Sequence, residues 1–511
     1  MSTRIAVAAP DRPSVDAALR VVEQGGGAVD AAVAAMLVTM VCEVGIVSLL
    51  GGLYATVWGA NETEAVTIDG CVAMPGIDPV AAPDPVRWEV DTGYGGGLTM
   101  TVGHGSVATP GAPAALGLLQ ERYGRLPWRE VVAPAEEVAR SGFELGQASG
   151  HYLPFVRESV FGWDPETVAG LRGSDGGWVE TGGLMVSPDL ADTLGLLARE
   201  GAATIYRGDL GRAIVADMAE RGGLVTAADL SAYSPVVRPS LAWRAGRWQL
   251  RTNPPPAIGG ATLAAMMTIL GDRPTGPWTR ADVEALVGAQ RTVLDIRHDR
   301  IDVASDRDSA VRQMLSGVGL GGERAPSTAH VSVVDSDGTA CALTASHGYG
   351  SGATVPGTGL WLNNCLGEHE LNRAAIAPGK ILASNMAPSV GRRDDGAVLA
   401  IGSPGADRIT TALLQVLAGF VHAGTSLQAA VDRPRLHVHH LDSLDGPEVR
   451  VEVEDDLPLP PLDLPVRTHP SRSMYFGGVA ATLRHPDGSV EAAGDPRRTG
   501  VVAVGPAATG A

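Results

Sequence analysis

The sequence is rich in small aliphatic residues and poor in aromatic ones, and this balance limits how the chain can pack. Hydrophobic residues make up 45% of the 511 residues, yet there are only 9 Trp, 8 Tyr and 5 Phe. The interior must be built mainly from Ala, Val, Leu and Ile, whose compact side chains let sheets and helices pack closely in layers. We therefore expect an α/β fold in layers, as one large domain or as several smaller ones.

Apolar residues at helical spacing predict that the first part of the chain is mainly helical. Residues 14–24 form one such pattern, and three glycines at 25–27 end it before a second helix begins at Ala28. This second run ends at Cys42, before Glu43, so it is shorter than the roughly 20 residues of a membrane span and predicts a buried helix. The further helical patterns lie at 112–123, 127–140, 188–200, 208–220, 260–270, 281–299 and 408–422.

Strand patterns dominate the last third of the chain. Residues 328–334 and 340–345 are two β-type runs around an Asp-Ser-Asp-Gly turn, which predicts a hairpin. A polar, glycine-rich connection at 319–326 precedes them, so the organisation changes there. Residues 76–105 hold many Gly, Pro and Asp residues and predict a long loop over a cleft. The other strand patterns lie at 53–58, 65–69, 359–363, 398–402, 448–453, 475–483 and 499–505.

Charge and cysteine content exclude several classes of partner and site. Asp plus Glu number 57 against 39 Lys plus Arg, and the net charge of −18 repels phosphate backbones and anionic lipid. We therefore expect no nucleic-acid and no membrane partner. The four cysteines contain no Cys-x-x-Cys pair, so neither a zinc knuckle nor a disulfide framework is expected. The apolar run before Asp11 is too short for a signal peptide, which predicts a cytoplasmic protein.

Several motifs occur in the order in which γ-glutamyltranspeptidases have them, and the sequence resembles that family over nearly its whole length. The segment 327–338 resembles the site at which these proteins cut themselves. The resemblance implies an N-terminal-nucleophile hydrolase with a four-layer αββα sandwich. It also implies one intertwined domain whose mainly helical part, 1–327, and mainly sheet part, 328–511, stay associated after cleavage. The other matching motifs are 26–32, 109–111, 222–226, 229–233, 363–364, 402–405 and 495–498.

The resemblance identifies Thr328 as the nucleophile, which cleavage after Ser327 turns into a chain terminus. A hydroxyl is a weak nucleophile, and a free α-amino group with a pKa of about 7.7–8.0 can take its proton near neutral pH. Ser346 stands where the family has a threonine that supports the nucleophile. Gly405 and Ala406 match the backbone pair of the oxyanion hole, for which alanine suffices if its φ allows. An ordinary strand serine and a plain turn are the alternatives at these positions.

The residues that hold a γ-glutamyl group in the family are changed in this chain. Cys71 stands where an arginine binds the α-carboxylate, and Cys365 and Glu368 replace a glutamine and an aspartate that bind the α-amino group. Loss of the arginine would leave a buried carboxylate unpaired, which costs several kcal/mol. The sequence therefore predicts that γ-glutamyl compounds are not the substrate. The expected substrate-binding positions are Cys71, His347, Asn364, Cys365, Glu368, Ser384 and Asn385.

We expect no metal and no other cofactor, and a small molecule as substrate. His437, His439 and His440 lie close together, but the family has a similar run without a metal, and no carboxylate stands at ligand spacing. The glycines at 95–97 are not followed by the Lys-Ser/Thr pair of a phosphate-binding loop.

Three functions remain open from the sequence. The nucleophile can cleave an amide of a different acyl donor, or it can attack a ketone and break a carbon–carbon bond. Relatives of the transpeptidases in antibiotic pathways that build alkylated proline units remove an oxalyl fragment in this second way. The third function is that of an inactive binding or scaffold protein, against which the intact Thr328, Ser346 and Gly405 argue. The oligomeric state, a homo-oligomer included, also stays open.

An anionic substrate would need a new cation in place of the lost arginine, because an unpaired carboxylate in a dry site is costly. Arg373, Arg408 and His347 are the candidates near matched positions. We favour His347, whose side chain is new relative to the family and follows Ser346 directly. As a neutral imidazole it could also hydrogen-bond a ketone oxygen or move a proton.

Overall fold

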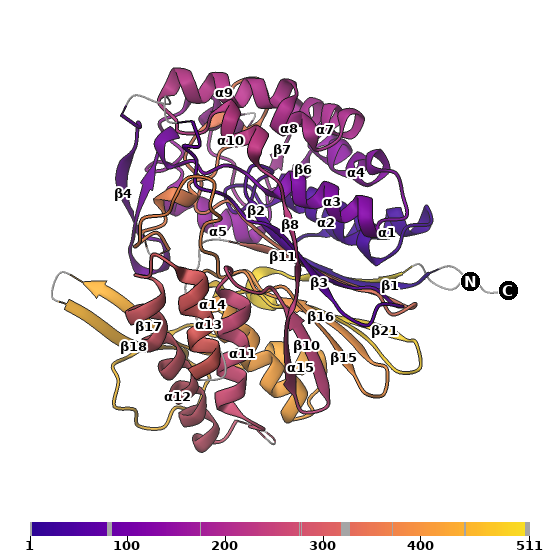
Figure 1. Cartoon of the computed structure of the whole chain (residues 1–511), viewed down its shortest axis with the longest axis vertical. Coiled ribbons are helices and arrows are strands. Elements are labelled where there is room, and N and C mark those ends of the chain that lie inside the picture. The colour runs from indigo at the N-terminus through magenta and orange to yellow at the C-terminus, as the bar shows by residue number, and fades with distance from the viewer. Residues whose placement is uncertain are drawn as a thin grey trace.

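Two stacked β-sheets lie between two layers of helices in a computed structural model of the chain (Figure 1). The model describes residues 3–505 except 79–83, 174, 275, 277, 318–327, 370 and 444–445. One sheet has seven strands in the order β22-β1-β11-β12-β2-β3-β8, and the other has six in the order β21-β20-β16-β15-β10-β9. Neighbouring strands run antiparallel throughout both sheets. The expected αββα architecture is confirmed.

Strands from before and after residue 328 pair with one another in both sheets, so the two parts of the sequence are intertwined. The seven-stranded sheet consists of β22 (Val501–Gly505), β1 (Ile5–Ala9), β11 (Ala329–Asp335), β12 (Ala340–Ser346), β2 (Gly52–Trp58), β3 (Val66–Gly70) and β8 (Val236–Pro239). The six-stranded sheet consists of β21 (Val490–Gly494), β20 (Ala480–Arg484), β16 (Val398–Gly402), β15 (Ser389–Arg393), β10 (Trp248–Thr252) and β9 (Leu241–Ala245).

Helices cover the outer face of each sheet (Figure 1). Over the seven-stranded sheet lie α1 (Arg12–Glu23), α2 (Ala28–Cys42), α3 (Ala112–Tyr123), α4 (Trp128–Ser141), α5 (Gln147–Val156), α6 (Pro165–Gly170), α7 (Pro188–Glu200), α8 (Ala203–Arg207), α9 (Asp209–Arg221) and α10 (Ala227–Ala232). Over the six-stranded sheet lie α11 (Gly259–Leu270), α12 (Arg280–Ile296), α13 (Arg307–Gly317), α14 (Arg408–Leu417) and α15 (Leu427–Asp432).

The α2 helix is the buried support of the strands that carry the site. All of its 15 residues are buried, because it packs against β11 and β12 on one side and against α1, α3 and α4 on the others. A helix that is apolar all round has no other stable place in a protein of this kind. It ends at Cys42, and the side chain of Glu43 that follows is only 3% exposed.

Small residues fill the space between the two sheets, which explains why the chain needs so few aromatic residues. Close spacing of this kind lets facing strands of the two sheets touch, as β11 does with β16 and β20. The buried residues at this interface include Ala6, Val334, Ala340, Ala342, Val390, Val398 and Ala400.

The expected loop over 76–105 is wrong for its second half. Residues 88–102 form a hairpin of β4 (Trp88–Thr92) and β5 (Leu98–Val102), in which the polar strand residues face outward and hide the strand pattern. The 319–326 connection lies outside the described residues. The remaining strands are β6 (Phe143–Glu144), β7 (Leu184–Met185), β13 (Thr354–Val355), β14 (Leu360–Trp361), β17 (Leu436–Ser443), β18 (Gly446–Glu454) and β19 (Val466–His469).

Candidate active site

Thr328 lies immediately before β11 and is fully buried. β11 pairs with β12 so that Ala329 is opposite Ala345, and the same register places Thr328 opposite Ser346. The Ser346 hydroxyl accepts a hydrogen bond from the backbone N–H of Gly348 at 3.1 Å. The two hydroxyl residues expected from the sequence therefore meet at one end of the seven-stranded sheet, whereas Ser327 lies outside the described residues.

Gly405 and Ala406 form a turn with left-handed backbone between β16 and α14. Gly405 has φ +133°, and a Cβ there would lie 2.6 Å from the Cα of Gly477, so only glycine fits. Ala406 has φ +58°, a conformation that costs an L-residue about 1–2 kcal/mol. Ala406 and the following Asp407, with φ −64°, have backbone of opposite hand, and such a pair directs successive N–H groups to one side, as in anion-binding nests.

The turn is held by a buried carboxylate. Asp407 pairs with Arg408 and accepts a hydrogen bond from Nε2 of His437 at 3.1 Å. Burial disfavours the charged form of Asp407, but Arg408 and His437 outweigh it and hold its pKa well below the usual range. Burial lowers the pKa of His437 to about 4, so this histidine is neutral near pH 7.

The other two histidines of the run contact carboxylates on separate elements. His439 lies 3.4 Å from Glu452, and His440 lies 2.7 Å from Asp295 of α12. Within the described ranges, no three His, Cys, Asp or Glu side chains are arranged to hold a metal ion.

Thr328 lines a small cavity of about 10 Å³, called the Thr328 cavity below, together with two charged side chains. Glu43, Arg498 and Pro404 line it together with Thr328. Burial and the nearby Asp11 raise the pKa of Glu43 to about 8, against the opposing effect of Arg498. The sequence analysis did not single out Glu43, although a carboxylate directly after a wholly apolar helix is a visible signal.

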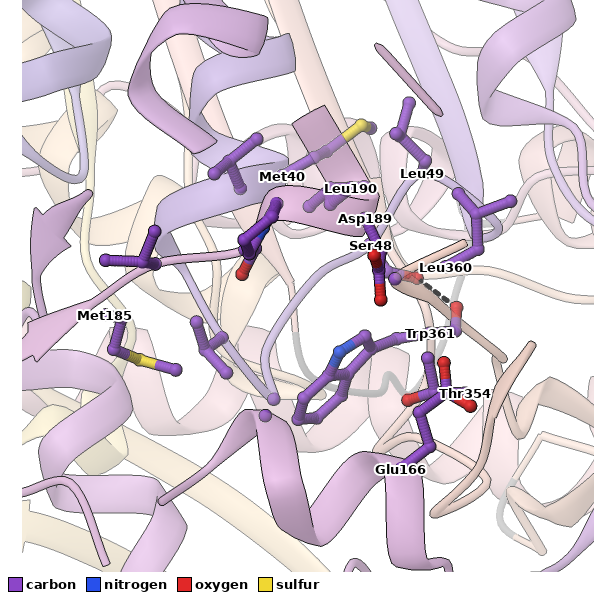
Figure 2. Close-up of a pocket in the computed structure, with 18 of the residues that line it drawn as sticks. Met40, Ser48, Leu49, Glu166, Met185, Asp189, Leu190, Thr354, Leu360 and Trp361 are labelled. Atoms are coloured by element: carbon purple, nitrogen blue, oxygen red, sulfur yellow. Dashed lines mark hydrogen bonds between the residues drawn. The ribbon is translucent and has the colours of Figure 1, made fainter. Parts of the chain in front are cut away.

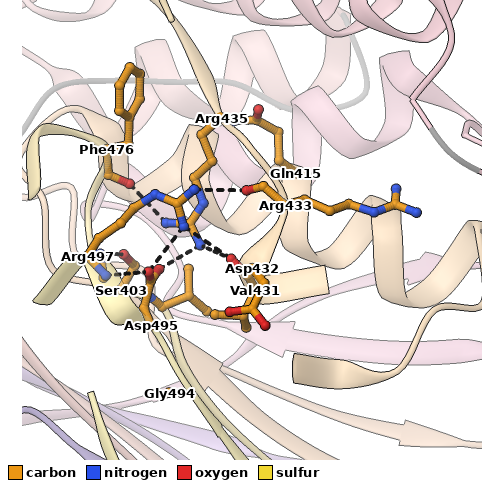
Figure 3. A network of polar contacts seen from close by, with 12 residues as sticks. Ser403, Gln415, Val431, Asp432, Arg433, Arg435, Phe476, Gly494, Asp495 and Arg497 are labelled. Carbon is orange, nitrogen blue, oxygen red and sulfur yellow. Dashed lines mark hydrogen bonds and ion pairs between the residues drawn. The ribbon is translucent and has the colours of Figure 1, made fainter. Parts of the chain in front are cut away.

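An ion-pair network fixes the segment that carries Arg498 (Figure 3). Asp495 pairs with Arg435 at 2.6 Å and with Arg497 at 3.1 Å, and all three side chains are almost fully buried. Arg497 also donates to Glu454 at 2.7 Å. Removing one partner of such a buried pair typically costs about 3–5 kcal/mol, so the next residue, Arg498, is held firmly at the cavity.

Cys71, which stands where the family has an arginine for the α-carboxylate, lies in an apolar cluster. Cys71 and Cys365 belong to one buried cluster that also contains Leu382 and Met386. The Cys71 thiol donates to the carbonyl of Leu382 at 3.9 Å. Burial raises the pKa of both thiols, so they stay neutral, and this cluster offers no positive charge to a ligand.

The polar residues around this cluster differ in how far they are already hydrogen bonded. Asn364 accepts from the N–H of Tyr349 at 2.6 Å and donates to the carbonyl of Thr101 at 3.2 Å. The Ser384 hydroxyl accepts from the N–H of Met386 at 3.2 Å. Within the described part of the chain, the fully buried side-chain amide of Asn385 has no hydrogen-bond partner. Asn385 therefore keeps its capacity to bind a ligand.

Glu368 and His347 are both buried, and His347 directly follows Ser346 in the chain. Glu368 is 2% exposed and raises the pKa of the Cys365 thiol further. Nε2 of His347 donates to the carbonyl of Gly45 at 3.1 Å, and burial lowers the pKa of His347 to about 4. His347 is therefore neutral near pH 7 and does not supply the positive charge that the sequence analysis expected of it.

A second cavity, of about 230 Å³, holds two arginines and is called the arginine cavity below. Arg408 and Arg467 line it, and the Arg408 guanidinium lies 4.5 Å from the ring centre of Tyr475. Arg408 lies two residues beyond Ala406, so the arginine cavity lies beside the turn of Gly405 and Ala406. Burial and the charge of Arg498 lower the pKa of His151, which also lines this cavity. Its other aromatic walls are Tyr94 and Phe155. Arg373 lines neither of these two cavities.

Two stretches of the chain match the family model named Gamma-glutamyltranspeptidase, residues 14–320 and 319–505. The chain belongs to the γ-glutamyltranspeptidase family. It is an enzyme of the hydrolase class, as its relatives in this family are.

Among the relatives of this family member is glutathione hydrolase 5 proenzyme of Rattus norvegicus, 30% identical over 86% of this chain and 82% of the relative. The acylase ACY 1 proenzyme of Pseudomonas sp. (strain V22) is 30% identical over 81% of this chain and 78% of the relative. A solved structure of cephalosporin acylase from Bacillus halodurans has a TM-score of 0.78, with 22% identity, and covers 98% of this chain and 96% of that one. The last likeness bears on the fold alone.

This γ-glutamyltranspeptidase-family chain also has an apolar cavity of about 270 Å³ on the helical side of the seven-stranded sheet (Figure 2). Met40, Met185, Leu190 and Trp361 point into it. Thr328 is not among the described residues that line it, so we do not assign the reaction to this cavity. In the described residues, every helix is too short or too polar to cross a membrane.

Proposed function

We propose that this protein is an N-terminal-threonine hydrolase that cleaves itself between Ser327 and Thr328 and acts on a substrate other than a γ-glutamyl compound. The facing positions of Thr328 and Ser346 and the left-handed turn at Gly405 and Ala406 support the first part. The names of both curated relatives, which are proenzymes, also support it. The parts 1–327 and 328–511 then remain associated, because both contribute strands to each of the two sheets. A cytoplasmic location belongs to the same proposal.

The chemistry needs one residue for attack and one turn for charge stabilisation. The free α-amino group of Thr328 takes the proton of the Thr328 hydroxyl, whose oxygen attacks the carbonyl carbon of the substrate. The N–H groups of Gly405 and Ala406 stabilise the negative charge that develops on the carbonyl oxygen. The resulting ammonium group protonates the leaving group, and water then releases the acyl group from the threonine.

The apolar cluster around Cys71 carries the second part of the proposal. A γ-glutamyl group has a carboxylate and an ammonium group, and both need charged or polar partners when they are buried. Cys71 and Cys365 are neutral thiols in an apolar environment. A γ-glutamyl compound would thus lose its strongest binding interaction in this site.

The arginine cavity indicates what the substrate carries instead. Arg467 is half-buried, and no carboxylate among the described residues forms an ion pair with it. Together with Arg408 it can bind a carboxylate, and the rings of Tyr94, Phe155 and Tyr475 can pack against an aromatic group. We therefore infer a small aromatic or apolar acyl donor that bears a carboxylate.

A carbon–carbon bond hydrolase is the second candidate, because the same cavity suits an aromatic keto acid. Thr328 would attack the ketone, the bond to the neighbouring carbon would break, and that carbon would take up a proton. Removal of an oxalyl-type fragment from a keto acid intermediate in antibiotic (alkylproline) biosynthesis is such a reaction. The products separate the candidates, since an amide substrate releases an amine and a keto acid does not.

Mass spectrometry of the purified protein tests the proposal in two steps. Denatured wild-type protein should give two chains that split at Thr328. After brief incubation with a γ-glutamyl anilide, an aromatic N-acyl amino acid or an aromatic keto acid, only the latter two classes should add an acyl mass to the chain that begins with Thr328. Rapid release of aniline from the γ-glutamyl compound would overturn the substrate assignment.

A further inference from the structure

We propose that Glu43 is the acid that protonates the backbone nitrogen of Thr328 when the chain cleaves itself. This inference rests on the proposed self-cleavage and adds a residue to it. Breaking the Ser327–Thr328 peptide bond requires a proton on the departing nitrogen, and the hydroxyl that attacks cannot be the final source of that proton without a relay.

The position of Glu43 is the first argument. Glu43 caps the C-terminal end of α2, whose buried body packs against β11 and β12, so the helix delivers this side chain to the end of the sheet that carries Thr328. Glu43 and Thr328 line the same cavity of about 10 Å³, roughly the volume that one water molecule needs. A water molecule in this cavity can carry a proton between the two groups.

The cost of placing a carboxyl group there is the second argument. The C-terminal end of a helix carries partial negative charge, which disfavours a carboxylate. Glu43 is 3% exposed, and it lies at the C-terminal end of α2, where a carboxylate cannot cap the helix. Its carboxyl group forms no ion pair among the described residues. A buried acid that harms stability when ionised needs a role other than folding.

The charged and titratable groups around Glu43 keep it protonated near neutral pH. Burial and the carboxylate of Asp11 at the start of α1 favour its neutral form, whereas Arg498 opposes this. Cys42 stays a neutral thiol, because burial raises its pKa. His330, which also lines the cavity, is neutral as well, because burial lowers its pKa to about 3.

Among the described residues that line the cavity or adjoin Glu43, none replaces it as proton donor. His330 is hydrogen bonded through both ring nitrogens, to Thr344 at 2.7 Å and to Ser332 at 2.8 Å. Asp11 has a pKa of about 6, raised by burial and lowered by its bonds to Ser14, so it is mainly ionised at pH 7. The guanidinium of Arg498 does not give up a proton in this pH range.

The step balances as follows. The Thr328 oxygen forms a bond to the carbonyl carbon of Ser327, and the bond from that carbon to the Thr328 nitrogen breaks. The O–H bonds of Glu43 and of Thr328 both break. The Glu43 proton forms a new N–H bond as the peptide bond breaks, and the Thr328 hydroxyl proton reaches the same nitrogen through a water molecule, which leaves an ammonium group. Water then hydrolyses the ester between Ser327 and Thr328. Glu43 ends as a carboxylate beside the new amino terminus.

Self-cleavage of newly made full-length protein measures this step without any substrate. Precursor made in a short cell-free pulse is followed over time on denaturing gels at pH 6 to 9. Glu43→Gln keeps the shape of the side chain but has no acidic proton, so it should cleave about 10²-fold more slowly at pH 7. Glu43→Asp keeps an acid and should cleave faster than Glu43→Gln. Glu166→Gln, a change of the same kind at the apolar cavity, should cleave like wild type.

The pH dependence gives a test that does not depend on how well Glu43→Gln folds. Wild-type cleavage should fall as pH rises past about 8, where Glu43 loses its proton. Asp11→Asn removes a negative charge that raises the pKa of Glu43, and asparagine still caps α1, so the fall should move to lower pH.

The outcomes separate this inference from the function on which it rests. If wild-type protein never cleaves, the proposed function fails. If wild type cleaves, but Glu43→Gln does so at the same rate and Asp11→Asn leaves the pH dependence unchanged, Glu43 is not the acid and the inference alone is overturned.

Discussion

Thr328 and Ser346 occupy facing positions at the open end of the β11–β12 pair, one step beyond the paired Ala329 and Ala345. Facing residues of an antiparallel pair have Cβ atoms about 4.5–5.5 Å apart, which brings two hydroxyl groups within reach of one another. A serine can therefore support the nucleophile here as a threonine does elsewhere in the family.

Replacement of Ser346 tests this support. Ser346→Ala should lower turnover by about tenfold or more, because the hydroxyl that supports the attacking oxygen is lost. It should lower the melting temperature slightly, because the buried N–H of Gly348 loses its acceptor. Ser351→Ala makes the same chemical change nearby, where the hydroxyl donates to the carbonyl of Leu362 at 3.1 Å. Equal turnover in both variants would remove Ser346 from the mechanism.

Arg467 tests the substrate class. Arg467→Gln should raise KM for a carboxylate-bearing substrate about tenfold and change kcat less, since the arginine binds a part of the substrate that does not react. The effect should shrink at high salt, because the side chain is only half-buried. Arg244→Gln on the exposed face of β9 is the matched control. An unchanged KM for anionic substrates would show that the carboxylate binds elsewhere.

The left-handed backbone of Ala406 predicts an unusual stability effect. Ala406→Gly should raise the free energy of unfolding, or leave it equal, because relief of about 1–2 kcal/mol of strain exceeds the added freedom of the unfolded chain. Ala412→Gly within α14 should instead lower it by about 1 kcal/mol or more. Thermal unfolding of both variants measures this. A loss of stability in Ala406→Gly equal to that in Ala412→Gly would contradict the strain.

The buried carboxyl of Glu43 predicts how stability depends on pH. Its pKa rises from 4.5 to about 8 on folding, so the folded chain binds the proton more tightly than the unfolded chain. Stability from this group is therefore complete below about pH 4.5 and is lost as pH rises toward 8. In a Thr328→Ala background, the free energy of unfolding of Glu43→Gln, relative to that of its parent, should rise by about a few kcal/mol between pH 5 and pH 8. A gap that does not widen with pH would contradict the raised pKa.

Much of the fold follows from local patterns in the sequence, and the errors have physical causes. The helices at 112–123 and 188–200 agree with α3 and α7, because periodic apolar residues of each face the core. The strand at 398–402 agrees with β16, because turn residues bound its short apolar run on both sides. β1 was not predicted, since its five residues are buried on both faces and lack the alternation of a half-exposed strand.

The proposed site could be inferred from the sequence only where single residues carry the chemistry, and the roles of these residues stay predictions. Thr328, Ser346 and the turn at Gly405 could be placed from motifs, because their order along the chain is enough. The role of His347 could not be judged, because its charge depends on burial by distant segments such as Gly45. The grouping of Glu43 with Arg498 joins chain segments more than 450 residues apart, which no local pattern reveals.

Intact mass of denatured wild-type protein, beside Thr328→Ala, is the most direct test of the central claim. We predict two wild-type chains, residues 1–327 and 328–511, that elute together before denaturation, and a single inactive 511-residue chain for Thr328→Ala. A wild-type protein that stays one chain while it is fully active would contradict the account.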